Sequence, residues 1–502
     1  MLSFLLLAGV ALYWLGRRLT RSYSLAQTAK NQGCQPFTHR YPHIDVLGGI
    51  DLSLQTWRNF HEGQLSEGMR RRHEALGITY VAKELGAECI YTIDPENIRT
   101  VTTFNFESWG KSSWVNEAAK HVGHGILMNE GEAWKHSKAM LKPMFARTAF
   151  DEPTLLEPHI QSLVATIRRE EGKPFDFQEI AARFTLDVVT DFLFGQSTLC
   201  LSGGPENDEA IHFLSLIKEF EPPSGTFIAV GMLAWLELLP SYRKLIAVVN
   251  GMKAFFRKKL DTIISEGCVG ENTGVTRDVS PSIFRMMKAQ GIPPDRIQGE
   301  LQNIFFASWD TTTGLVSNLV DILSRRPDVQ SRLREEIKLL GGKIPTNPDV
   351  AKLEYLRFVI WETLRLYSPV TSHSRQARED TTLPKGGGRD GNSPVFVPAG
   401  TTVIWSTYSL NRNPKLYGED WAEYRPERWA QLKATSSDFF MPFGSGPRTC
   451  MGQQMVQAEV SYIIVRLLQT FEEIKNEDQR SFKEAKAVSF YNAHGTLVSV
   501  KE

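Results

Sequence analysis

The chain has 502 residues and balanced charge, since 57 lysines and arginines stand against 57 aspartates and glutamates. This balance gives no electrostatic argument for nucleic acid or an acidic partner, and 42% hydrophobic residues suffice for a large buried core. The five cysteines are scattered without C-x-x-C spacing. Their odd number and low density argue against a disulfide framework and a zinc cluster, and favour a reducing compartment.

The N-terminus begins with 16 residues that carry no charge, and three arginines follow by residue 21. As a helix, this segment would be roughly 24 Å long, short of the roughly 30 Å hydrocarbon core. A thinner endoplasmic-reticulum bilayer and arginines that reach the interface would close the gap. The competing interpretation, a cleaved signal peptide, places its positive charges before the apolar run. We predict a membrane anchor at 1–16, a basic linker at 17–30 and a cytosolic domain at 31–502.

The first half of the domain shows both helical and strand patterns. Alternating apolar positions predict short strands around 78–81 and 88–92. Helical spacing predicts helices at 56–73, at 131–142 and over most of 155–265. Within the second of these, Trp134 and Lys138 are four residues apart and therefore point the same way.

A longer helix is predicted from Pro294 to Arg326, because Pro327 follows it. Asp310 and three consecutive threonines, 311–313, lie near its middle. Threonines are poor helix formers, and a threonine hydroxyl can bond back to the preceding turn and bend the helix. A locally opened turn would expose carbonyls and hydroxyls that hold water. The alternative is a polar break in a core helix.

The second half predicts a further helix and then strands. The helix runs from Asp349 to Leu366 and stops at Ser368-Pro369. Its Glu362 and Arg365 share a face, which in isolation indicates an ordinary surface pair. Strands are expected at 370–375 and 395–401, a helix at 452–470 and a hairpin tip at 492–496.

The most informative stretch is 443–452, Phe-Gly-Ser-Gly-Pro-Arg-Thr-Cys-Met-Gly. Cys450 precedes a predicted helix, whose positive dipole end and free N–H groups would lower the thiol pKa. The glycines let the backbone turn tightly and approach a flat cofactor. Arg448 would pair with a carboxylate of that cofactor, and Phe443 would shield the sulfur from water. The alternative is a structural cysteine in a glycine-proline turn.

This stretch resembles the heme-binding loop of the cytochrome P-450 superfamily, Phe-x-x-Gly-x-Arg-x-Cys-x-Gly, at all five defining positions. The long helix resembles the family pattern Ala/Gly-Gly-x-Asp/Glu-Thr-Thr/Ser through Ala307, Asp310, Thr311 and Thr312, with Ser308 in place of glycine. The resemblance implies a mainly α fold with a smaller β-rich lobe. Heme b would lie between the long central helix and the cysteine loop.

The resemblance also implies roles for single residues. Cys450 would be the axial thiolate and the metal ligand, and Asp310 and Thr311 would deliver protons. Lys138 departs from the family's arginine and keeps its charge without the bidentate fork. The complete set of implied positions is as follows: cofactor contacts at Cys450, Arg448, Trp134, Lys138, Arg375, Phe443 and Gly444; structural ion pairs among Glu362, Arg365 and Arg428; substrate pocket at Phe306, Ala307, Val370, Thr371 and His494.

The implied activity is that of a heme-thiolate monooxygenase, which uses dioxygen and electrons that originate from NADPH. No strand–GxGxxG–helix unit is present, so a separate reductase must supply the electrons. Tyr41-Pro42-His43, residues 134–137 and residues 184–195 resemble the fungal branch that hydroxylates alkanes and fatty acids. The expected enzyme is therefore anchored in the endoplasmic-reticulum membrane and hydroxylates a lipophilic substrate.

Other functions stay open. The same fungal branch serves specialised metabolism, so the substrate is alternatively a polyketide or terpenoid scaffold. A dioxygen-independent isomerase or dehydratase is a second alternative, against which the Asp310–Thr311 pair argues. A non-catalytic heme sensor is a third, and both the anchor and the proton relay argue against it.

Overall fold

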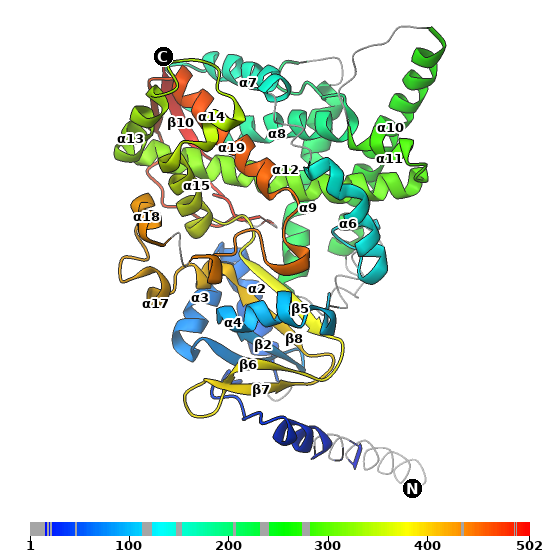
Figure 1. Ribbon diagram of the computed structural model, residues 1–502, viewed down its shortest axis with the longest axis vertical. Helices are drawn as coiled ribbons and strands as arrows, with labels where there is room; N and C mark the ends of the chain where they lie inside the picture. Colours follow the sequence, from blue (N-terminus) through cyan, green and yellow to red (C-terminus); the bar gives the residue numbers. More distant parts are fainter. Residues whose placement is uncertain are drawn as a thin grey trace.

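A β-rich lobe and a larger helical body make up the chain (Figure 1). The computed structural model describes residues 16–17, 20, 23–45, 48–112, 123–146, 153–203, 207–230, 240–273, 282–432, 436–485, 487 and 489–502. The helical residues 23–30 lie beyond the β lobe, and the C-terminus lies in the helical body. The predicted division into a mainly α fold with a smaller β lobe is confirmed.

The β lobe is built on a five-stranded sheet of order β1-β2-β8-β5-β3. Strands β2 and β8 are parallel, and the other neighbours are antiparallel. Both strands predicted around 78–81 and 88–92 are present. The elements of the lobe are α2 Ile50–Glu62, α3 Leu65–Leu76, β1 Thr79–Glu84, β2 Ala87–Thr92, α4 Pro95–Arg99, the π-helix Thr100–Phe104, β3 Trp109–Gly110, β5 Ser372–Ala377, β6 Thr381–Gly387, β7 Ser393–Val397 and β8 Thr402–Ser406.

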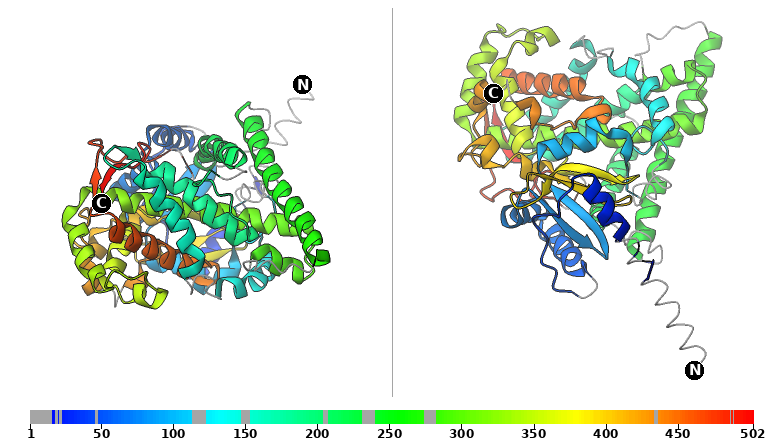
Figure 2. Two further views of the ribbon diagram at one scale, coloured as in Figure 1. Left: turned by 90° about the horizontal axis from the view of Figure 1, so that it is seen from above. Right: turned by 60° about the horizontal axis from the view of Figure 1, so that its bottom comes forward.

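The helical body surrounds α12, which crosses its middle (Figure 1), while α10 runs along one edge (Figure 2). Its helices are α6 Gly131–Ala146, α7 Pro153–Arg168, α8 Phe177–Phe194, α9 Asn207–Val230, α10 Pro240–Thr273, α11 Ile283–Ala289, α12 Pro294–Arg325, α13 Pro327–Lys338, α14 Asn347–Ala351, α15 Glu354–Leu366 and α19 Gln453–Thr470. Short helices and strands complete the two parts: α16 Thr407–Leu410, α17 Pro414–Tyr417, α18 Trp429–Leu432, β4 Phe175–Asp176, β9 Glu473–Asn476 and β10 Leu497–Lys501, with 3-10 turns at Phe106–Ser108, Pro426–Arg428, Ser436–Asp438 and Gly446–Arg448.

Two predicted helices are each divided in the structure. The one expected at 56–73 is split between α2 and α3, because Gly63 adopts a left-handed φ of 69° and ends α2. The one expected at 349–366 is split between α14 and α15. Glu336 of α13 accepts the N–H groups of Tyr355 and Leu356, and thereby begins a new helix there.

A hydrogen-bonded turn is present within the predicted hairpin tip at 492–496, since the N–H of Gly495 donates to the carbonyl of Asn492, but the paired segments of the hairpin lie before it. Glu484 pairs with Asn492, and the N–H of Ala485 donates to the carbonyl of Tyr491. The turn of this hairpin therefore lies before Tyr491.

Residues 1–15, nearly all of the predicted anchor, lie outside the described part of the chain. Within the described part, no helix is long and apolar enough to cross a membrane. Residues 23–30 of the predicted linker are helical.

Candidate active site

Helix α12 is buried along most of its length but keeps accessible surface at its centre. Residues 299–305 and 312–324 are buried, whereas Phe306, Ala307, Ser308, Asp310 and Thr311 are not. Ala307 and Thr311 are one turn apart and share a face. We call residues 306–311 the open strip. Surface that remains open in the middle of a core helix indicates a functional site.

Aromatic side chains back the open strip. The ring of Phe305 lies 5.3 Å from those of Phe213 and Phe256, and Phe306 stacks on Phe220 at 5.8 Å. Met451, the residue after Cys450, packs against the apolar cluster that contains Phe305. The cysteine loop and the open strip therefore adjoin one hydrophobic cluster.

The acid and the alcohol of the strip have different partners. Thr311 Oγ1 donates to the carbonyl of Ala307 at 2.6 Å, so the predicted back-bonding is confirmed. Helix α12 nevertheless stays continuous here, and the expected opened turn is wrong. Asp310 Oδ2 accepts a 2.6 Å hydrogen bond from Ser489. Burial raises the pKa of Asp310 to about 6, against the lowering effect of that hydrogen bond.

The cysteine loop is held by its own backbone. Cys450 N–H donates to the carbonyl of Phe443 at 2.9 Å. Gly446 has a φ of 71°, and a Cβ there would lie 1.9 Å from the carbonyl oxygen of Thr102, so only glycine fits. Gly444 also has a positive φ of 73°. Both glycines are needed for the path of the loop.

Cys450 is exposed, whereas Cys34, Cys89 and Cys200 are buried. Desolvation by the surrounding protein nevertheless raises the thiol pKa, although the N–H of Gly452 lowers it. The predicted lowering is therefore wrong, because α19 begins only at Gln453 and a single N–H reaches the sulfur. An accessible, otherwise unpaired sulfur is suited to bind a metal, which would favour the thiolate.

Cationic side chains gather beside the cysteine loop around one carboxylate, Glu130. The Arg448 guanidinium lies 4.4 Å from the Trp134 ring and donates to the carbonyl of Asn129. Burial lowers the pKa of Arg448 to about 10, and Arg375 repels it further. Burial, Arg448 and Arg375 together lower the pKa of Lys111 to about 7. Arg448, Arg375 and Lys111, which we call the cationic cradle, carry more positive charge than Glu130 offsets.

Lys138 has a different partner from the one expected. Its Nζ donates to the carbonyl of Pro447 in the cysteine loop, and it lies 5.3 Å from the Trp134 ring. The predicted contact of Lys138 with the cofactor stays a prediction. In this structure Lys138 ties α6 to the loop.

Glu362, Arg365 and Arg428 are brought together in the interior. Glu362 Oε1 accepts from Arg365 at 2.8 Å and from Arg428 at 2.9 Å, and Oε2 accepts from the Trp429 indole at 3.0 Å. Their side chains are 0%, 0% and 2% exposed. The two arginines also donate to carbonyls between residues 411 and 423. The cluster therefore fixes the segment that leads to the cysteine loop.

The residues predicted for the substrate pocket are dispersed. Phe306 and Ala307 lie on the open strip. Val370 is exposed, and the Thr371 hydroxyl lies 2.9 Å from the Ser66 hydroxyl of α3. The N–H of His494 donates to the side-chain oxygen of Asn492 at the end of the hairpin. For all five residues a pocket role stays a prediction.

The family profile for cytochrome P-450 matches residues 52–495. The chain belongs to the cytochrome P-450 family. Relatives include the cytochrome P-450 monooxygenase FPY7 of Fusarium mangiferae, 33% identical over 99% of this chain and 95% of the relative. The monooxygenase himC of Aspergillus japonicus is 34% identical over 99% and 88%. Cytochrome P-450 52A10 of Candida maltosa is 33% identical over 96% and 94%. The chain is thus a heme monooxygenase of this family.

Heme b fits the residues present in this cytochrome P-450. An accessible cysteine supplies a thiolate ligand. The cationic cradle concentrates half-buried positive charge that Glu130 alone does not balance, which suits a ligand with two carboxylates. Both features adjoin the apolar cluster behind the open strip.

Two residues near the site, Lys111 and Ser489, were not predicted from the sequence. Lys111 stands outside every family motif in the sequence, and its role depends on arginines from distant segments. Ser489 lies in a polar stretch near the C-terminus, and only folding brings it to Asp310. Neither carries a local signal that reveals its position.

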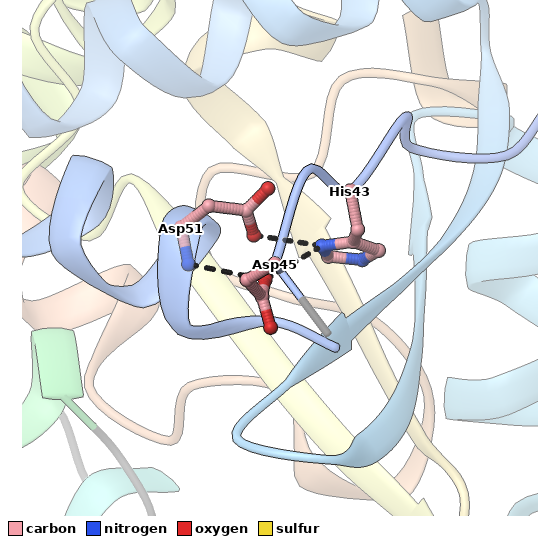
Figure 3. A group of neighbouring side chains, drawn as sticks. All are labelled: His43, Asp45 and Asp51. Carbon is pink, nitrogen blue, oxygen red and sulfur yellow. Dashed lines mark hydrogen bonds and ion pairs between the residues drawn. The ribbon is translucent and has the colours of Figure 1, made fainter. Parts of the chain in front are cut away.

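A second polar cluster, far from the cysteine loop in sequence, is His43, Asp45 and Asp51 (Figure 3). His43 Nε2 accepts from the N–H of Lys83 at 2.8 Å, so its proton is on Nδ1, which lies 2.8 Å from Asp51. Neither nitrogen then has a free lone pair for a metal. The cluster instead ties the start of α2 to β1.

Proposed function

We propose that this cytochrome P-450 hydroxylates a long-chain lipophilic substrate of the fatty-acid or alkane type. The observation that carries the proposal is the open strip, where an acid and an alcohol stand beside aromatic side chains. An apolar wall favours an aliphatic chain, and the polar pair supplies protons where the oxidation occurs.

The residues around the cofactor have binding and positioning roles. Cys450 would ligate the iron, and Trp134, Arg448, Arg375 and Lys111 would hold the heme carboxylates. When bound, heme supplies the reductive activation of dioxygen and the insertion of one oxygen atom into a C–H bond. Glu362, Arg365 and Arg428 would keep the cysteine loop in place for heme retention.

Asp310 and Thr311 would control protons at the strip. With a pKa near 6, the Asp310 carboxyl exists in both protonation states near neutral pH, so it can release a proton and regain one. The Thr311 hydrogen points to Ala307, which leaves its oxygen lone pairs free to accept. Phe305 and Phe306 would limit the entry of bulk water.

Location and electron supply belong to the same proposal. The uncharged N-terminal segment would anchor the enzyme in the endoplasmic-reticulum membrane, where lipophilic substrates accumulate. A membrane-bound, NADPH-dependent reductase would supply the electrons, because the chain has no nicotinamide-binding fingerprint.

The first test is the carbon-monoxide difference spectrum of the reduced protein in membranes. We expect the red-shifted band of a thiolate-bound heme and its loss in Cys450→Ala. A band at the shorter wavelength typical of a histidine ligand would contradict the assignment of Cys450.

Turnover with NADPH and a reductase then tests the substrate. A series of alkanes and fatty acids is compared with a polyketide and a terpenoid of similar size. Hydroxylation within the aliphatic series supports the proposal. Turnover of the ring compounds alone would overturn it and assign the enzyme to specialised metabolism.

A further inference from the structure

The C-terminal hairpin reaches the middle of α12 through one serine. Ser489 is buried, and its Oγ lies 2.6 Å from Asp310 Oδ2. The backbone of the next residue, Phe490, is hydrogen-bonded at both its N–H and its carbonyl. Its N–H donates to the carbonyl of Pro369 at 2.8 Å, and its carbonyl accepts from Asn318 of α12 at 2.9 Å. The serine hydroxyl is therefore fixed relative to the open strip.

Packing and a second anchor restrict the hairpin further. The Phe490 ring stacks on Phe482 at 5.0 Å and also contacts Tyr367. At the hairpin base, the Glu484 carboxylate accepts from the N–H and the hydroxyl of Ser66 at the start of α3. These contacts hold the hairpin against both the β lobe and α12.

We propose that Ser489 is a positioning residue of the proton relay: its hydroxyl orients the Asp310 carboxyl and reverses its hydrogen-bonding role when that carboxyl changes protonation state. The proposal rests on the proposed function of Asp310 as the acid. It adds a residue from a separate part of the chain to the Asp310–Thr311 pair.

The chemistry of the two groups supports this role. Ionised, Asp310 accepts the Ser489 hydrogen; protonated, it can donate its own hydrogen to the Ser489 oxygen. When the Asp310 O–H bond breaks and its proton passes to a hydrogen-bonded acceptor, where a new bond to hydrogen forms, the Ser489 hydroxyl keeps its own hydrogen and turns it back to the carboxylate. A serine can satisfy both states, whereas a lysine or arginine would favour only the charged one.

Within the described residues, Ser489 is the side chain that forms a hydrogen bond with Asp310. No cationic side chain in the described ranges forms an ion pair with Asp310, and the neighbouring Thr311 hydroxyl donates to Ala307. Burial and the serine hydrogen bond are the influences acting on the carboxyl, with opposite effects on its pKa.

The test uses the full-length heme enzyme with Ser489→Ala, Ser489→Thr and Asp310→Asn. Two quantities are measured: hydrogen peroxide released per NADPH consumed, and the pH midpoint of the Asp310 carboxyl by infrared difference spectroscopy, assigned by its loss in Asp310→Asn. Ser324→Ala is the matched control, because Ser324 is a buried serine of α12 that donates to the carbonyl of Asp321.

We expect Ser489→Ala to move the carboxyl midpoint to higher pH, because it removes a hydrogen bond that favours the charged form. We expect the ratio of peroxide to product to rise about fivefold, the change that one hydrogen bond is worth. Ser489→Thr keeps the hydroxyl and should restore both values.

An unchanged midpoint and unchanged coupling in Ser489→Ala would overturn the proposal, as would a Ser489→Thr variant that behaves like alanine. If Asp310→Asn itself couples normally, the proposed role of Asp310 fails first. The infrared titration needs no turnover, and Ser489→Thr tests the hydroxyl even if the alanine variant loses heme.

Discussion

Glu362 and Asp310 are both carboxylates in the helical body, and the protein surrounds them in opposite ways. Glu362 receives hydrogen bonds from two arginines, one indole and the N–H of Arg425. Asp310 receives one, from Ser489. Cationic partners neutralise the charge of Glu362, and several donors share its two oxygens. Asp310 has no cationic partner within the described residues and accepts one hydrogen bond from a side chain.

The comparison separates a structural acid from a chemical one. A buried charge that is fully paired fixes the conformation of its neighbours, and removing its partner is costly. A carboxyl that the protein largely shields from water and that has a single neutral partner holds its proton more tightly, which places its pKa where an acid can act. Glu459 of α19 is the limiting case: its Oε1 has no partner within the described residues, and burial raises its pKa to about 8.

The largest expected effect is that of Glu362→Gln, which removes the negative charge of the paired carboxylate. The variant leaves the buried Arg365 guanidinium without a charge partner and leaves Arg428 only its ion pair with Asp420, which costs about 3–5 kcal/mol of the free energy of unfolding. Urea unfolding and heme content measure the loss. Glu335→Gln is the control, because its pair with Lys338 is 71% and 70% exposed and contributes less than about 1 kcal/mol. Equal effects of the two substitutions would contradict a structural role for Glu362.

The next largest effect is expected for Thr311→Ala, which tests the proposed proton relay of Asp310 and Thr311. We expect the heme spectrum to persist while dioxygen is diverted to hydrogen peroxide, with product formation reduced about a hundredfold. Product, peroxide and NADPH consumption are measured together. Thr262→Ala is the control, since Thr262 donates to the carbonyl of Lys258 on α10 in the same way. Normal coupling in Thr311→Ala would exclude the relay.

The pH dependence of stability should differ between wild type and Asp310→Asn. The folded protein holds the Asp310 proton up to a pKa of about 6, above the ordinary 3.8. Its contribution is therefore fully present below the ordinary pKa and is lost as pH rises through about 6. Relative to wild type, Asp310→Asn should gain about 3 kcal/mol between acidic and alkaline pH. Free energies of unfolding measured across this range check the sign, and parallel curves would refute it.

The smallest effect concerns the cationic cradle. Lys111→Met removes one cation, and we expect heme transfer to apomyoglobin to accelerate about fivefold, the equivalent of roughly 1 kcal/mol. Lys135→Met is the control, because Lys135 is half exposed and pairs with Glu132 on its own helix. If both variants release heme at the wild-type rate, Lys111 does not contact the cofactor.

Several elements were predictable because their signals are local. The strands at 78–81 and 88–92 alternate apolar residues, and prolines mark both ends of the long helix from Pro294. Other boundaries were not predictable. Helix α15 begins where Glu336 of another helix caps it, and the hairpin turn depends on the pairing of Glu484 with Asn492.

The candidate site divides in the same way. Cys450, Asp310 and Thr311 stand in short motifs, so the sequence by itself determined the family and the residues that carry the chemistry. The tertiary structure alone decided that Lys138 holds the loop carbonyl, that Lys111 joins the arginines and that Ser489 meets Asp310. The sequence motifs contain the chemical groups that the reaction needs. The partners that tune those groups come from distant segments, and burial, which sets their pKa values, exists only in the folded chain.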